Sequence, residues 1–244
     1  MSRAVKGLIV ALVFFVAGAI VAGTGFALGG AEVLFAFDDA EYETHEVTVD
    51  ETFTSIEIDC VIDNITVRRS ENDTCTVVYC EPSEVTHEIE VEGDTLVISA
   101  EDDRVYMLPF DLESEHPYVE LYLPGDEYDR LFINVSEGSI ELDELNIGSL
   151  RIDCSAGEIE LQNVIAFEII ELDLDVGDVK LNACDAPLIR ITNDMGDVTG
   201  TLLTNKTFEA HTDMGDVDVP SGGGDGVCEI DVDTGNISID IAGA

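Results

Sequence analysis

Hydrophobic and polar residues alternate with a fixed period along the C-terminal half of the chain. Six glycines, at positions 138, 157, 177, 196, 215 and 235, are separated by 19 or 20 residues. Counted from each glycine, positions −7, −5, −3, +2 and +4 are apolar in 27 of 30 cases, the exceptions being Asn193, Thr212 and Gly200. The intervening positions −6, −4, −2, +1 and +3 are polar in 29 of 30 cases. Such alternation is typical of strands with one buried face.

Each repeat unit predicts two short strands that meet at a glycine bend. One unit cannot bury its apolar face alone, but units stacked about 4.8 Å apart would enclose a continuous core. The same pattern occurs earlier around Asp63, with apolar residues at the matching positions 56, 58, 60, 65 and 67. The sequence therefore predicts an all-β fold, a β-solenoid of about 19–20-residue coils in a single chain.

Residues 47–130 are less regular than the repeats that follow. Alternating runs predict strands at 74–80, 87–91, 95–99 and 118–123, and Glu92–Asp94 predicts a hairpin turn between two of them. Residues 102–117 are expected to form a loop. We expect one solenoid domain over 47–244, in which 47–130 is an irregular, capping part and 131–244 holds the regular repeats.

The N-terminal segment predicts a membrane anchor. Residues 8–28 carry no charge, whereas Arg3 and Lys6 precede them and acidic residues follow. An apolar helix of about 20 residues spans a bilayer, and basic flanks stay in the cytoplasm. We expect a cytoplasmic tail at 1–6, a transmembrane helix at 7–30, a linker at 31–46, and an extracytoplasmic C-terminal domain on a single-pass cell-membrane protein. The alternative is a cleaved signal peptide.

The charge balance limits the classes of partner. The chain has 53 Asp and Glu against 10 Lys and Arg, a formal net charge of −43, with 45% hydrophobic residues. That apolar fraction is too high for a disordered acidic tail, and the charge excludes nucleic acid as an expected partner. The acidity fits adaptation to high salt, repulsion between open solenoid ends, or recognition of a cationic partner. We favour repulsion combined with solubility.

The repeat units also resemble a known family. The anchor, the stretch Tyr42-Glu43-Thr44 leading to TFTSIEID, and the recurring DxGD units are similar to a bacterial family of membrane-anchored β-strand-repeat proteins labelled "putative adhesins", a domain of unknown function. The resemblance covers residues 40–241. It implies the fold and a surface location, and it transfers no catalytic residue. Where members commonly have STGD corners, this chain has Asp-Met-Gly-Asp at 194–197 and 213–216.

Aspartates beside the corner glycines are the candidate metal ligands. If successive coils stack in register, aspartates at −2 and +1 form columns with like charges about 5 Å apart, which Ca²⁺ could bridge with oxygen ligands. Solvated turn carboxylates are the alternative, because Asp before Gly is common in turns. No other cofactor is expected. The candidates are Asp175, Asp178, Asp194, Asp197, Asp213, Asp216 and Asp233.

The cysteines and histidines give no catalytic pattern. Cys60, Cys154, Cys184 and Cys228 fall in apolar columns and are expected in the core, with one disulfide among the six cysteines as the alternative. The four histidines are scattered, and none is placed near a candidate nucleophile by the repeat register. We therefore expect no catalytic residue and no enzyme activity.

Three functions fit these observations. The first is a membrane-anchored surface protein, an adhesin or scaffold, that binds a surface protein or glycan. The second is an envelope sensing or signalling accessory with cation-responsive acidic corners. The third is a polysaccharide-active β-helix enzyme, which needs a cleft in the irregular stretch 102–130. The acids and aromatics of that stretch are Tyr106, Phe110, Asp111, Glu113, Glu115 and Tyr118.

Overall fold

The computed structural model describes residues 42–82, 85–102, 117–125 and 127–243, and every element in these ranges is a strand. The predicted all-β class is therefore confirmed for the described residues. No helix among them is long and apolar enough to cross a membrane. The predicted tail, transmembrane helix at 7–30 and most of the linker lie outside the described residues, as does most of the predicted loop at 102–117.

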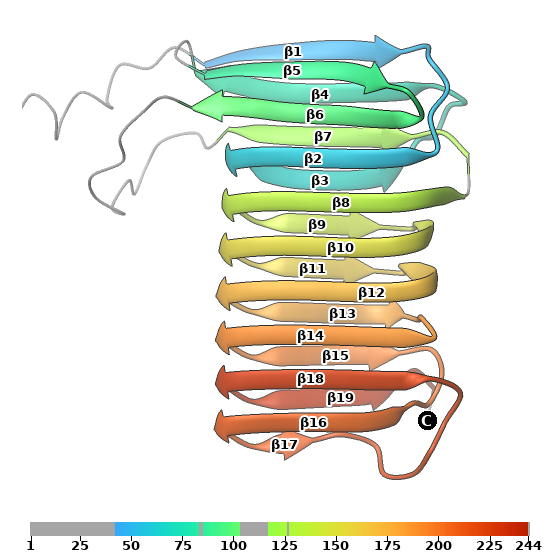
Figure 1. The fold of residues 1–244 in the computed structure, drawn as a ribbon, viewed down its shortest axis with the longest axis vertical. Coiled ribbons are helices and arrows are strands. Elements are labelled where there is room, and N and C mark those ends of the chain that lie inside the picture. Colours follow the sequence, from blue (N-terminus) through green and yellow to red (C-terminus); the bar gives the residue numbers. More distant parts are fainter. Residues whose placement is uncertain (1–41, 83–84, 103–116, 126, 244) are drawn as a thin grey trace, which may run out of the picture. The chain divides into compact units, whose positions relative to one another are not determined.

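The regular repeats form coils, each with one strand in a nine-stranded sheet and the next in a ten-stranded sheet (Figure 1). Within this stack, corresponding strands of adjacent coils pair in parallel, with local register shifts between Ile147 and Ser149 and between Leu181 and Cys184. Each coil consists of two strands that follow each other in the chain. These are β2 (Ser55–Ile62) with β3 (Asn64–Arg69), β8 (Tyr128–Glu137) with β9 (Ile140–Asp143), β10 (Asn146–Ala156) with β11 (Ile159–Gln162), β12 (Ile165–Val176) with β13 (Val179–Cys184), β14 (Leu188–Met195) with β15 (Val198–Leu202), β16 (Thr207–Met214) with β17 (Val217–Asp218), and β18 (Val227–Thr234) with β19 (Ile237–Ile241).

The corner glycines are required by close approach between coils. Gly177 has φ +138°, and a Cβ added there would lie 1.6 Å from the carbonyl oxygen of Gly157. The same relation holds between Gly157 and Gly138, and between Gly138 and Asp63. The periodic glycine is therefore dictated by the neighbouring backbone as well as by φ.

The order of the last two coils differs from the sequence order that we expected. The β18–β19 coil pairs with β14–β15 on one side and with β16–β17 on the other, so the final coil of the chain lies inside the stack (Figure 1). The β16–β17 coil is consequently the terminal one. Its inward position Val217 is 42% exposed, because no further coil covers it.

A cap precedes the regular coils. It is built from β1 (Tyr42–Val49), β4 (Cys75–Pro82), β5 (Val85–Glu92), β6 (Thr95–Asp102) and β7 (Tyr118–Leu123). The β4 strand pairs antiparallel with β1 and β7, and β5 pairs antiparallel with β6 through the predicted turn at 92–94. The four predicted strands of this region are confirmed. The β1 strand begins at Tyr42, five residues before the domain start that we expected.

The inward rows of both sheets make one apolar core. All six cysteines are buried and free, so the predicted core role of the four column cysteines is confirmed and the alternative of a disulfide is not observed. Two exceptions to the apolar pattern have a specific partner. Asn193 Nδ2 donates to the Gly177 carbonyl at 3.0 Å, and Thr212 Oγ1 donates to the Gly235 carbonyl at 2.9 Å. These polar side chains thus satisfy corner carbonyls of adjacent coils.

Candidate functional site

An exposed apolar column runs along the glycine corners of the stack. The alternation of inward and outward side chains is interrupted at the bend, so the residue just before each glycine faces outward. Strand pairing aligns these residues in neighbouring coils, and Val176, Met195 and Met214 are 49%, 55% and 66% exposed. We call this column the corner ridge. Its members, in spatial order, are Ala156, Val176, Met195, the polar Thr234 and Met214. The residue before Gly138 is Glu137, which pairs with Ala156 and ends the apolar part of the row.

Two rows of acidic side chains flank the corner ridge. The sequence-predicted aspartates all lie here, half-exposed or exposed, and the structure therefore brings them to one edge of the stack. Because the last two coils exchange places, the −2 row does not follow the expected order. In space the row reads Asp175, Asp194, Asp233, Asp213, and the +1 row reads Asp178, Asp197, Asn236, Asp216.

The +1 row forms a ladder of hydrogen bonds between coils. The Asp178 carboxylate accepts the backbone N–H of Asp197 at 2.9 Å, and the Asp197 carboxylate accepts that of Asn236 at 2.7 Å. The Asn236 side-chain oxygen accepts the N–H of Asp216 at 3.1 Å, while its Nδ2 donates to Asp197 at 3.1 Å. The amide of Asn236 therefore separates two carboxylates, which reduces like-charge repulsion within the row.

Calcium binding by these aspartates stays a prediction. Among the described residues, the groups of three or more His, Cys, Asp or Glu side chains with ligand atoms close enough for one ion do not include the corner rows. The ladder gives two of the corner carboxylates, those of Asp178 and Asp197, a backbone N–H donor. Thermal unfolding in calcium chloride and in sodium chloride of matched ionic strength decides the question, since only bound calcium would raise the melting temperature beyond screening.

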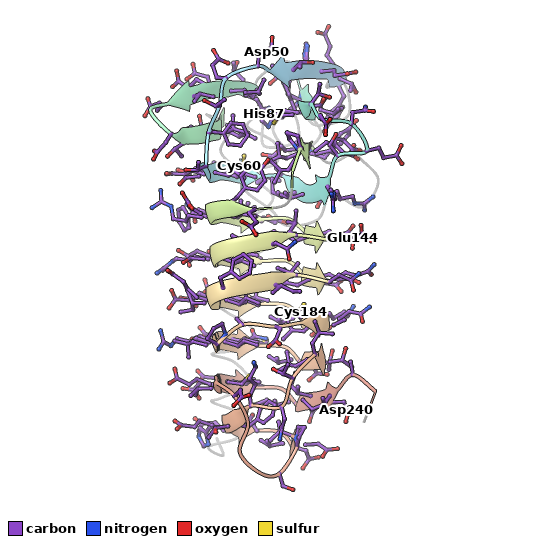
Figure 2. The ribbon with its side chains drawn as sticks, turned by 90° about the vertical axis from the view of Figure 1, so that its right-hand side faces the viewer. Asp50, Cys60, His87, Glu144, Cys184 and Asp240 are labelled. Atoms are coloured by element: carbon purple, nitrogen blue, oxygen red, sulfur yellow. The ribbon has the colours of Figure 1, made fainter. Side chains whose placement is uncertain are left out.

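A second candidate site is a buried cluster where the cap meets the first coil. Cys60 lies near the end of β2, Asp63 stands at the bend between β2 and β3, and His87 comes from β5. A sulfur, a carboxylate oxygen and a ring nitrogen of these residues all lie within 4.8 Å of one another. The three residues are 2%, 2% and 5% exposed. Figure 2 labels His87 and Cys60, which lie close together at the cap end.

An aspartate stands at this bend in place of the corner glycine. In the later coils, a side chain at this position would meet the carbonyl of the neighbouring corner. Asp63 is the corner of the first regular coil, and its carboxylate is buried against the cap, where its Oδ1 lies 3.1 Å from His87 Nε2.

Glu81 of β4 completes the surroundings of His87. Its Oε2 accepts the backbone N–H of His87 at 2.7 Å and lies 2.9 Å from the Nδ1 ring nitrogen. Its Oε1 is 3.6 Å from His45 Nε2. The ring of Tyr79 packs between the two histidines, with centroid distances of 5.1 Å to His45 and 5.0 Å to His87. The cluster is therefore a connected polar network within the cap.

The electrostatics of the cluster oppose nucleophilic chemistry. Burial, followed by the charges of Asp63 and Asp59 and a hydrogen bond to Asp63, raises the pKa of the Cys60 thiol well above its ordinary value. Burial alone would lower the pKa of His87, but hydrogen bonds and charges from Asp63 and Glu81 outweigh it and raise that pKa. A protonated, buried thiol is a poor nucleophile. These residue types in one buried place are those of transition-metal ligands, and a bound metal ion stabilises the thiolate form of a coordinating cysteine.

The structure corrects the expectation that no histidine lies near a cysteine. His87 is close to Cys60, although the residues are 27 positions apart in the sequence. Of the residues expected to line an enzymatic cleft, Tyr118 begins β7, and the others lie outside the described residues.

Comparison with known proteins identifies the fold and the family. A solved structure of a "putative cell adhesion protein" from Clostridium sporogenes is similar with a TM-score of 0.54 and 12% identity, over 82% of this chain and 100% of that one. A "putative adhesin" structure from Parabacteroides distasonis matches with a TM-score of 0.36 and 14% identity, over 82% of this chain and 98% of that one. A "putative adhesin" structure from Bacteroides fragilis matches with a TM-score of 0.38 and 12% identity, over 83% of this chain and 98% of that one.

At this level of identity, the Clostridium structure supports the fold alone. No curated protein matches the chain. Residues 53–244 match the family described as Toastrack DUF4097. That span holds the coil stack, its corner glycines and all of the cap except β1. The chain therefore belongs to the Toastrack DUF4097 family.

Proposed function

We propose that this chain is a membrane-anchored surface protein that acts by binding, and that the corner ridge is its binding face. The apolar segment at 7–30 supports the anchor, and its basic flank supports an extracytoplasmic coil stack. The similarity to a protein named for cell adhesion supports the surface role. In this role, the coil stack holds the corner ridge in a fixed geometry.

The exposed apolar column of the corner ridge carries this proposal. Val176 and Met195 pair directly across adjacent strands, and Met214 lies one coil beyond Thr234. Scattered single apolar residues on a surface need no explanation, but an aligned column on a rigid stack is typical of an interaction surface. Methionine suits this role, because its flexible, polarizable side chain adapts to different partners.

The flanking carboxylates indicate the chemistry of the partner. A segment that places apolar side chains on the corner ridge would meet aspartates on both sides. A protein segment that alternates lysine or arginine with apolar residues matches this arrangement, whereas a neutral glycan leaves the carboxylates without a countercharge. We therefore propose a cationic, partly apolar protein segment as the ligand.

A triple substitution of the corner ridge tests the binding face. We expect Val176→Ser, Met195→Ser and Met214→Ser together to weaken binding of a synthetic Lys/Leu peptide to the full chain by at least about tenfold. Each of the three partly exposed side chains contributes about 0.5–1 kcal/mol of apolar burial, and tenfold corresponds to about 1.4 kcal/mol. Fluorescence anisotropy of the labelled peptide measures the change.

Two other exposed apolar residues provide the matched control. Phe167 and Leu203 are 54% and 41% exposed but lie away from the corner ridge, so Phe167→Ser with Leu203→Ser should leave the affinity unchanged. An equal loss in this control would refute the assignment of the face. Equal binding of a Glu/Leu peptide, or binding of neutral glycans in its place, would refute the proposed chemistry of the partner.

A further inference from the structure

The buried cluster at the cap brings together the three kinds of atom that bind zinc. Zinc takes thiolate sulfur, imidazole nitrogen and carboxylate oxygen at about 2.0–2.3 Å in tetrahedral geometry, which sets ligand atoms about 3.3–3.6 Å apart. The ligand atoms of Cys60, Asp63 and His87 lie within 4.8 Å of one another, and the His87–Asp63 pair is already at 3.1 Å. The three ligand atoms therefore lie within reach of one zinc ion.

Glu81 fixes the orientation that a metal-binding histidine needs. The 2.9 Å contact between Glu81 Oε2 and His87 Nδ1 suits the tautomer in which Nδ1 carries the proton and donates it to the carboxylate. The other ring nitrogen, Nε2, then faces Asp63 and Cys60. A carboxylate behind the ring that holds the tautomer is a recurrent partner of zinc-bound histidine. Here it comes from a different strand, β4, than the histidine, which lies on β5.

From these contacts we propose that Cys60, Asp63 and His87 bind one zinc ion, with Glu81 as the positioning residue for His87. A water molecule is the expected fourth ligand. The proposal does not depend on the binding function of the corner ridge, which lies outside the cluster.

Zinc binding at this cluster is coupled to proton release, because the metal binds the thiolate form of cysteine and the neutral form of histidine.

The position of the cluster gives a zinc ion a structural role. Asp63 helps to line a surface hollow of about 420 Å³ together with Pro117 and Gly138. His87 belongs to β5, which lies at the edge of the nine-stranded sheet beyond β6, while Cys60 belongs to β2 of the first coil. A zinc ion would therefore join the edge of the cap to the coil stack.

Metal uptake by the purified full chain tests the proposal, with Cys154 as a matched control. Cys60 and Cys154 hold the same inward position in their coils, but Cys154 is not part of the cluster. After removal of metal with a chelator, we expect wild type and Cys154→Ser to take up one zinc per chain, and Cys60→Ser to lose that site. Replacement of zinc by cobalt adds a thiolate-to-cobalt absorption band that only a bound cysteine produces.

A second variant keeps the test valid if Cys60→Ser does not fold. Glu81→Gln leaves all three ligands in place, and we expect it to weaken zinc binding about 10–100-fold while retaining the cobalt–thiolate band. Absence of zinc uptake by wild type overturns the proposal. So does uptake that Cys60→Ser leaves unchanged, or an equal response to zinc, calcium and magnesium, which would indicate charge screening only.

Discussion

Replacing Gly177 with alanine is expected to lower the free energy of unfolding by at least about 3 kcal/mol. The new Cβ would lie 1.6 Å from the carbonyl oxygen of Gly157, and φ at this position is +138°. Strained backbone at a non-glycine residue costs about 1–3 kcal/mol, and forced overlap in a packed interior costs a similar amount. Urea denaturation followed by circular dichroism measures the change.

The control is a glycine that also has a positive φ, in the left-handed helical region, but has open surroundings. Gly93, in the turn between β5 and β6, has φ +69°, and an added Cβ there would meet nothing within 4 Å. Gly93→Ala should therefore cost about 1 kcal/mol, the backbone contribution alone. Similar losses in the two variants would show that close approach between coils does not determine the corner glycines.

Loss of the Lys206 charge should be almost as damaging. The Lys206 side chain is 3% exposed, and its Nζ forms an ion pair with Asp185 and donates to Thr204 Oγ1 at 2.7 Å and to the Asp225 carbonyl at 3.1 Å. Lys206→Met leaves these groups without their shared donor. Removal of one partner of a buried ion pair typically costs about 3–5 kcal/mol, and the 19% exposure of Asp185 favours the lower end. Differential scanning calorimetry reports the loss.

Two further variants separate this effect from a general loss of charge. Asp185→Asn added to Lys206→Met should recover part of the stability, because the unpaired carboxylate is removed. Lys180→Met removes a lysine that also has a carboxylate partner, Glu158, but its side chain is 48% exposed. Little change is expected there, since exposed ion pairs contribute little. A large loss in Lys180→Met would contradict this explanation.

The regular coils could be predicted because two local rules determine them. Alternation fixes which side chains face the core, and the glycine at each bend is needed by the neighbouring backbone. Gly157 and Gly177 illustrate the second rule, since each approaches the corner before it. Both rules act within one coil and its neighbour, so a single sequence reveals them.

The order of the last two coils could not be read in the same way. Every coil has the same inward pattern, so the pattern does not say which coil stacks on which. Two signals were present in the sequence. Asn236 replaces the aspartate of the +1 row where it now separates Asp197 from Asp216, and the link between β17 and β18 is longer than the links between earlier coils. The longer link carries the chain back to the inner position.

The buried cluster was missed because its residues are brought together by the cap. His87 lies on an antiparallel hairpin whose packing against the first coil no periodicity describes. The available signal was Asp63, which stands where later coils have glycine. Cys60 faces inward three residues before Asp63, and this combination indicated an unusual corner. The third ligand, His87, could be found only from the structure.

The most direct test of the proposed surface function is to measure the accessibility of the coil stack in intact cells. Because all six cysteines are buried, wild type should remain unlabelled by a membrane-impermeant maleimide. A chain with Ser221→Cys, in the exposed link between β17 and β18, should be labelled without cell lysis. Labelling only after lysis would place the coil stack inside the cell and contradict the proposed surface function.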